Sequence, residues 1–179
     1  VHIIAELMYA TGLRISEVAA LTLDDVDFDR GTITIYDGKK GKSRIAFLND
    51  YAKEVLRIYV NKMRDVIFSE WNQRNNKLIF GVQWGWLGKV VNTTLNRVAK
   101  ESGYEGFTSH GFRHAVGYHL LRAGCNIRYI QQLLGHELLR NTEIYTKVEK
   151  EDLREVLDTY HPRKWRKRDG EETNPEKNS

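Results

Sequence analysis

The first 21 residues have the hydrophobic spacing of two helices. Apolar side chains recur every three or four positions from Val1 to Ala10, and again from Ile15 to Leu21. This spacing places them on one face of a helix. Gly12 stands between the two runs and predicts the break between the helices.

Residues 32–48 change to the pattern of β-strands. The segments 32–35 and 45–47 are rich in β-branched and aromatic residues, and they flank a polar stretch that contains Gly38 and Gly41. Short runs of this kind on either side of a glycine-containing turn are typical of a β-hairpin. We therefore predict a hairpin with a lysine-rich turn.

The remaining chain is predicted to be almost entirely helical. Asn49 or Asp50 is expected to cap a helix that ends near Phe68, and Leu78–Phe80 is expected as a short strand. Further helices are expected over 86–102, 109–124, 126–134, 142–148 and 151–160. The residues expected in the core from the helix after Asn49 and the helix over 86–102 are Val55, Leu56, Ile58, Tyr59, Leu87, Val90, Val91, Leu95 and Val98. The fold class is α+β, mostly helical, with a small antiparallel β-hairpin or sheet.

Composition narrows the class of protein. The chain has 179 residues, 41% of them hydrophobic, which suits one domain with a substantial core. Its net charge of +4 favours a polyanionic partner. Cys125 is the only cysteine, which excludes an internal disulfide and fits a reducing compartment. No apolar run reaches the roughly 18 residues that a membrane helix needs, so we expect a cytoplasmic protein without a membrane partner.

The two ends of the sequence carry separate expectations. Val1 is not an initiator methionine and a helix begins at once, so we expect a fragment that lacks an N-terminal domain. Residues 1–160 are expected to form one domain. Residues 161–179 contain both prolines, a basic block and an acidic, apolar-poor end, and are expected to be a mobile tail.

Two pairs of residues have the spacing of a phosphate-binding site. Arg14 and Glu17 are three apart, so on a helix the carboxylate can orient the guanidinium. His110 and Arg113 repeat this spacing near a predicted helix start, where anions are favoured. Each pair also has an ordinary interpretation, since the first can be a surface ion pair and the histidine a structural residue.

A metal site is a weaker interpretation of the same histidines. His110 and His114 are four apart and can share a zinc ion on one helical face. Further ligands at a suitable spacing are missing from the sequence, so we expect no metal and no cofactor.

Four motifs in order resemble the tyrosine recombinase family, which includes phage integrases and Xer-type recombinases. Residues 10–17, Ala-Thr-Gly-Leu-Arg-Ile-Ser-Glu, resemble its first arginine motif, and residues 110–114, His-Gly-Phe-Arg-His, resemble its H-x-x-R box. Residues 133–136, Leu-Leu-Gly-His, resemble its L-G-H box, and Tyr145 follows nine residues later. The resemblance extends from about Ala5 to Val148.

The resemblance implies a role for each matching residue. Arg14 and Arg113 would bind the scissile phosphate, His136 would donate a further hydrogen bond to it, and Tyr145 would be the nucleophile. Glu17 would support Arg14, and His110 would assist the tyrosine. The hairpin would supply the general acid, with Lys39 the first choice and Lys40 the second. The residues predicted to contact DNA are Lys42, Arg44 and Arg128.

The function implied is site-specific recombination of double-stranded DNA through a 3′-phosphotyrosyl intermediate, without metal or ATP. Exchange between two duplexes implies a homo-oligomer on DNA, expected to be a tetramer. Leu153, Val156 and Leu157 offer an apolar face for docking on a neighbouring protomer, although packing within the domain suits them equally. The alternatives are a DNA-binding module without chemistry and strand passage of the type IB topoisomerase kind.

Overall fold

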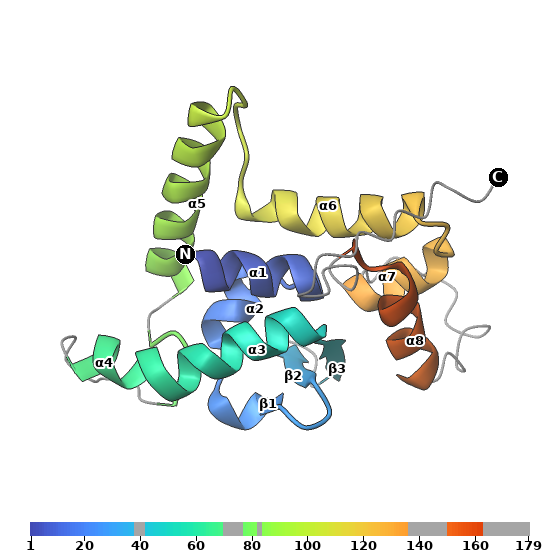
Figure 1. The fold of residues 1–179 in the computed structure, drawn as a ribbon, viewed down its shortest axis with the longest axis horizontal. Coiled ribbons are helices and arrows are strands. Elements are labelled where there is room, and N and C mark those ends of the chain that lie inside the picture. The colour runs from blue at the N-terminus through green and yellow to red at the C-terminus, as the bar shows by residue number, and fades with distance from the viewer. Residues whose placement is uncertain (38–41, 70–76, 82–83, 136–149, 163–179) are drawn as a thin grey trace, which may run out of the picture.

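The computed structural model describes residues 1–37, 42–69, 77–81, 84–135 and 150–162. Helices make up most of these residues, together with one small antiparallel sheet, so the predicted fold class is confirmed (Figure 1). The helices are α1 (His2–Thr11), α2 (Ile15–Ala20), α3 (Asp50–Ile58), α4 (Arg64–Ser69), α5 (Trp84–Glu101), α6 (Ser109–Arg122), α7 (Ile127–Leu134) and α8 (Lys150–Tyr160). The other elements are β1 (Val26–Asp27), β2 (Thr32–Asp37), β3 (Lys42–Phe47), a 3₁₀ turn η1 (Leu23–Asp25) and a π-helical turn η2 (Tyr59–Met63).

The break between α1 and α2 lies at Gly12, as predicted. Gly12 has φ 66° and ψ 18°, a left-handed conformation that favours glycine. Its N–H donates to the carbonyl oxygen of Met8 at 2.8 Å and so ends α1. A Cβ at this position would overlap the side chain of Leu134 on α7. Gly12 therefore both ends one helix and lets another approach closely.

The predicted hairpin corresponds to β2 and β3, which pair in antiparallel fashion. Ile33 lies opposite Ala46, and Ile35 lies opposite Arg44. The turn between the strands, residues 38–41, lies outside the described residues. The sequence interpretation missed η1 and the third strand, β1, which pairs with β2. A strand of two residues is too short to show an alternating pattern.

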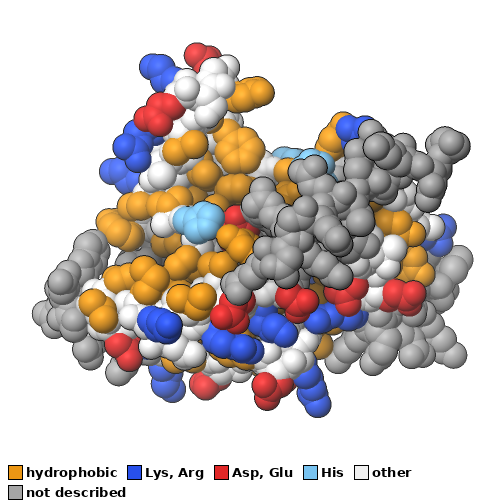
Figure 2. Space-filling model, in the orientation of Figure 1, with side chains coloured by type: hydrophobic (Ala, Val, Ile, Leu, Met, Phe, Trp, Pro, Cys, Tyr) orange, Lys and Arg blue, Asp and Glu red, His pale blue; other side chains and the backbone are white. Residues whose placement is uncertain are grey.

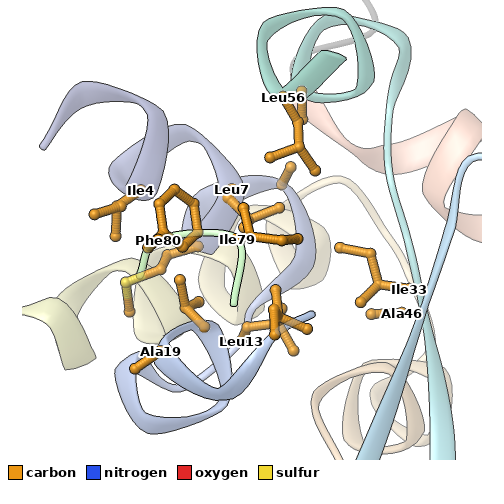
Figure 3. Packing of buried hydrophobic residues seen from close by; sticks show 14 of the residues in the cluster. Ile4, Leu7, Leu13, Ala19, Ile33, Ala46, Leu56, Ile79 and Phe80 are labelled. Carbon is orange, nitrogen blue, oxygen red and sulfur yellow. The ribbon is translucent and has the colours of Figure 1, made fainter. Parts of the chain in front are cut away.

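The main core lies between α1, α2, α3, α5 and the sheet (Figure 3). Leu7, Leu13, Ile33, Leu56 and Ile79 are almost completely buried there. The segment expected as a strand over 78–80 forms a single bridge between Leu78 and Thr22 instead, with Ile79 and Phe80 buried in the core.

Two residues expected in the core are exposed instead. Ile58 is 40% exposed because it follows Leu56 by two positions, which places it on the opposite side of α3. Leu56 and Tyr59, three apart, form the buried face. Val98 is 49% exposed because the last turns of α5 extend away from the body of the molecule (Figure 1).

A second hydrophobic cluster joins α6, α7 and α8. Leu153 and Leu157 of α8 are buried in it against residues such as Leu120 and Leu133. Arg154 adds a hydrogen bond from Nη1 to the carbonyl oxygen of Arg30 at 3.1 Å. The apolar face of α8, for which the sequence left two partners open, therefore packs on its own chain in this structure.

His161 closes α8 against the rest of the domain. It is 1% exposed, with Nε2 3.1 Å from the carbonyl oxygen of Tyr9 and Nδ1 3.4 Å from Nδ2 of Asn49. The packed domain thus includes His161, the first residue of the expected tail. The tail from residue 163 onward lies outside the described residues.

The surface carries exposed apolar side chains near the start of α5. Trp84 and Trp86 are 66% and 46% exposed. Figure 2 shows apolar side chains gathered on the side of the molecule where α5 and the N-terminus lie. Among the described helices, none has the length and apolar character needed to cross a membrane.

Candidate active site

A pocket of about 540 Å³ opens where the start of α2 faces α6 and α7. Four basic side chains line it, those of Arg14, His110, Arg113 and His114. The remaining lining consists of Gly117, Tyr118, Leu121, Ile127, Ile130, Gln131 and Leu134. Segments about 100 residues apart in the sequence thus place two guanidiniums and two imidazoles around one space.

Arg14 is held at the mouth of this pocket by Glu17. The chain turns at Gly12, and Arg14 is the residue that precedes α2. Glu17 accepts hydrogen bonds from the backbone N–H of Arg14 at 2.7 Å and from its Nη1 at 3.2 Å. The Arg14 side chain is still 43% exposed, so its remaining donors are open to a ligand. The orientation that the spacing of these two residues predicted is present.

Arg113 reaches the same pocket from the interior. It is 7% exposed, and its Nη1 donates to the carbonyl oxygen of Gly12 at 2.7 Å. Its Nη2 donates to the carbonyl oxygen of Leu134, at the end of α7. A guanidinium has five N–H donors, so these two bonds leave others for an anion. Arg113 therefore fixes the ends of α1 and α7 relative to each other.

The surroundings of Arg113 disfavour its positive charge. Burial, followed by the neighbouring positive charges of Arg14 and Arg44, lowers its pKa to about 10, and the carboxylate of Glu17 partly opposes this shift. The pKa is still far above 7, so the group is cationic at neutral pH. Removal from water and repulsion by like charges both favour the arrival of an anion, which would offset them.

His110 lies in the first turn of α6, one turn before Arg113. The start of this helix is tied to α5, because Asn92 Oδ1 accepts a hydrogen bond from Ser109 N at 2.8 Å. His110 and Arg113 both line the pocket, so they share a face of α6, as predicted. His114 also lines the pocket and is exposed. Its signal was the spacing of four from His110, which had suggested a metal pair instead.

Arg44 occupies a place that the sequence did not indicate. Its Nη2 lies 2.8 Å from both carboxylate oxygens of Glu17, and its side chain is 22% exposed. Arg128, in the first turn of α7, is exposed. The role in DNA binding predicted for both remains a prediction.

Several predicted residues cannot be placed. Lys39, Lys40, His136 and Tyr145 lie outside the described residues, and the side chain of Lys42 is also not described. Within the described ranges, no cluster of three or more His, Cys, Asp or Glu residues could hold a metal ion. The described part of the site is a pocket whose lining includes two arginines and two histidines. Such groups can stabilise the charge of a phosphoryl transition state.

Comparison with known proteins gives a consistent result. The model of the phage integrase family matches residues 2–152. The tyrosine recombinase XerC of Bacillus subtilis is 35% identical over 164 residues, which cover 90% of this chain and 54% of the relative. The tyrosine recombinase XerA of Thermococcus kodakarensis is 38% identical over 159 residues, covering 87% of this chain and 53% of the relative. The chain therefore spans about half the length of these relatives.

Solved structures share the fold. The crystal structure of a XerA recombinase has a TM-score of 0.62 and 28% identity, covering 90% of this chain and 58% of that chain. A XerH site-specific recombinase bound to its difH substrate has a TM-score of 0.61 and 24% identity, covering 75% of this chain and 39% of that chain.

Proposed function

Since this chain belongs to the phage integrase family, we propose that it is the catalytic part of a tyrosine recombinase that cleaves and rejoins DNA strands at specific sites. The observation that carries the proposal is the meeting of Arg14, His110 and Arg113 in one pocket. A binding module without chemistry has no need for a half-buried pocket that concentrates charge at one point.

The two arginines are proposed to bind the non-bridging oxygens of the scissile phosphate. Arginine remains charged and can donate two hydrogen bonds to a phosphate at once. Their different origins, one before α2 and one in α6, allow them to approach the phosphate from two sides. Their positive charges stabilise the negative charge that develops as the phosphorus is attacked.

The proposed reaction has two steps that use the same bonds. The hydroxyl oxygen of Tyr145 attacks the phosphorus, and the bond between the phosphorus and the 5′ oxygen breaks. A proton from Lys39, or from Lys40 as the second choice, goes to the leaving 5′ oxygen, and His110 accepts the tyrosine proton. His136 donates a further hydrogen bond to the phosphate. Attack by a 5′ hydroxyl then reverses the step and releases the tyrosine, so neither ATP nor a metal is consumed.

Strand exchange adds requirements for partners. The attacking 5′ hydroxyl must come from a second duplex, so we propose assembly of several copies, in a tetramer, on two double-stranded DNA sites. The chain spans about half the length of these relatives, and we propose that a further N-terminal domain shares in DNA binding. The place of action is then the DNA-containing cytoplasm.

The experiment that tests the chemistry uses a nicked suicide substrate, in which the strand downstream of the cut is lost and the covalent adduct accumulates. Denaturing electrophoresis is expected to show a covalent band with the wild type. Tyr145→Phe is expected to lose this band and still bind DNA. Tyr118→Phe is the matched control, because Tyr118 lines the pocket and is 57% exposed.

The outcomes separate the candidate functions. A band that persists in Tyr145→Phe and vanishes in Tyr118→Phe would transfer the role of nucleophile to Tyr118. DNA binding by the wild type without any band would indicate an architectural module. Relaxation of a supercoil without joining of two labelled duplexes would indicate a type IB topoisomerase activity.

A further inference from the structure

Arg44 lies on the inner face of the sheet. It is opposite Ile35 and two residues from Ala46, and these two neighbours are 6% and 2% exposed. Directly paired residues, and residues two apart in a strand, share one face of a sheet. Arg44 therefore faces the main core. A residue that contacts the DNA backbone is expected to face solvent, so the placement of Arg44 needs another explanation.

Glu17 links Arg44 to Arg14. Nη2 of Arg44 lies 2.8 Å from each oxygen of this carboxylate, and Nη1 of Arg14 lies 3.2 Å from one of them. Glu17 is itself only 17% exposed, so the link is shielded from water more than a surface ion pair is. Through this shared carboxylate the sheet fixes the orientation of a residue that lines the pocket.

A second contact joins Arg44 to the end of α7. Gly135 ends α7 with φ 63°, and a Cβ placed on it would lie 2.7 Å from Nε and 2.9 Å from Cδ of Arg44. The preceding residue, Leu134, lines the pocket and accepts the hydrogen bond from Arg113. Arg44 thus lies against both parts of the structure that hold the two pocket arginines.

Stability does not explain why an arginine lies here. Its Nη1 is buried and has no hydrogen-bond partner among the described residues. Glu17 is shared by Arg14 and Arg44, and Arg113 is close enough to feel both positive charges. A partly buried charge with an unsatisfied donor costs free energy that an apolar side chain would avoid. Such a cost is typical of residues kept for function.

We propose that Arg44 is a positioning residue, which holds Arg14 in its phosphate-binding orientation through Glu17 while supporting the end of α7 at Gly135. This inference rests on the proposed function, because it assigns Arg44 a part in the same cleavage step. A positioning role takes the place of the role in DNA binding that the sequence predicted for Arg44.

The first experiment compares Arg44→Gln with Arg30→Gln. Arg30 is the matched control because its side chain is 83% exposed and pairs only loosely with Asp27 at 3.8 Å. The rate of adduct formation on the suicide substrate is measured at saturating protein, and DNA affinity is measured over a range of salt concentrations. Arg44→Gln is expected to slow adduct formation roughly 10- to 100-fold and to leave the affinity for DNA unchanged, since a small misplacement of a phosphate-binding side chain costs that much in rate. Arg30→Gln is expected to behave as the wild type does.

A backbone contact would give the opposite pattern. Loss of one phosphate contact weakens binding and lowers the slope of log affinity against log salt by about one. That result for Arg44→Gln, with a normal cleavage rate at saturation, would overturn the inference. A wild type without any covalent band would instead refute the proposed function itself.

The second experiment tests whether Arg44 acts through Glu17. Glu17→Gln and the double variant with Arg44→Gln complete a double-mutant cycle. The double variant is expected to be no slower than the slower single variant. Independent effects that multiply would contradict the link.

A methylphosphonate at the scissile position replaces one charged oxygen by a methyl group. Less negative charge then has to be stabilised by the arginines, so the defects of Arg14→Ala and Arg44→Gln in adduct formation are both expected to shrink on this substrate.

Arg44→Lys separates positioning from loss of structure. The lysine keeps a charged donor for Glu17, so its cleavage rate is expected to lie between those of the wild type and Arg44→Gln. A rate no better than that of Arg44→Gln would contradict the inference, provided that thermal unfolding shows both variants folded. If Arg44→Gln does not fold, Arg44→Lys and Glu17→Gln are compared, and a normal rate in both would overturn it.

Discussion

The junction of α1 and α2 and the first turns of α6 each bring an arginine to the same pocket, but they hold it differently. Arg14 is 43% exposed and bound by the carboxylate of Glu17. Arg113 is 7% exposed and bound by the carbonyl oxygens of Gly12 and Leu134. The first is held by charge near solvent and the second by backbone in the interior.

This difference separates function from stability at the two positions. Removing Arg14 leaves a carboxylate that Arg44 still binds, so the fold loses little. Removing Arg113 leaves two carbonyl groups that lose their partner at the contact between α1 and α7. One region can therefore be changed for its chemistry alone, whereas the other combines the chemistry with the packing of the domain.

The largest expected effect is that of Arg113→Ala. Unpaired buried carbonyl groups and the lost side chain are expected to lower the free energy of unfolding by roughly 2–4 kcal/mol. Chemical denaturation measures this, and the suicide substrate is expected to show no adduct. A loss below about 1 kcal/mol would mean that the two carbonyl contacts add little to stability.

A smaller effect is expected from Gly12→Ala, which tests the same contact from the other side. Alanine is disfavoured at φ 66°, and its Cβ would overlap Leu134, so a loss of roughly 2–3 kcal/mol is expected. Gly103→Ala is the control, since Gly103 has φ 80° with open space around its Cβ. It is expected to lose about 1 kcal/mol, the cost of the left-handed conformation for alanine. Equal losses of stability in Gly12→Ala and Gly103→Ala would show that α7 shifts to accommodate the Cβ at no cost in free energy.

Arg14→Ala is expected to change stability less than either. An exposed ion pair contributes little, so the free energy of unfolding should fall by less than about 1 kcal/mol. Adduct formation should nevertheless fall by roughly 100-fold or more, because a ligand of the transition state is missing. Losses of stability as large as those of Arg113→Ala would remove the contrast between the two regions.

The smallest effect concerns inorganic phosphate as a probe of the pocket. With a dissociation constant of about 10 mM, 10 mM phosphate would stabilise the folded protein by about 0.4 kcal/mol. The midpoint temperature of thermal unfolding would then be about 1 °C higher than in chloride at the same ionic strength. Arg14→Ala should lose this response. A response that remains unchanged would locate the bound anion elsewhere.

The sequence by itself determined where most of the helices and the hairpin lie, and it singled out Arg14, His110 and Arg113. Gly12, Gly135 and the caps at Asn49 and Asn126 mark helix ends through local conformation, which depends on neighbouring residues alone. The spacing of three in each of the pairs that include Arg14 and Arg113 is also local. Ile58 was placed wrongly because it was counted with the apolar run, although the spacing from Leu56 to Tyr59 excludes it from the buried face.

Only the tertiary structure decided which of these local features meet. The contact of Arg113 with Gly12 spans 101 residues, and that of Arg44 with Glu17 spans 27. No spacing rule connects such positions, because their meeting depends on how the helices pack around the sheet. The same holds for His114, which faces the pocket, and for α8, which covers its own domain. Local propensity fixes where a helix begins and ends, and the burial of its apolar face fixes what its polar residues can reach.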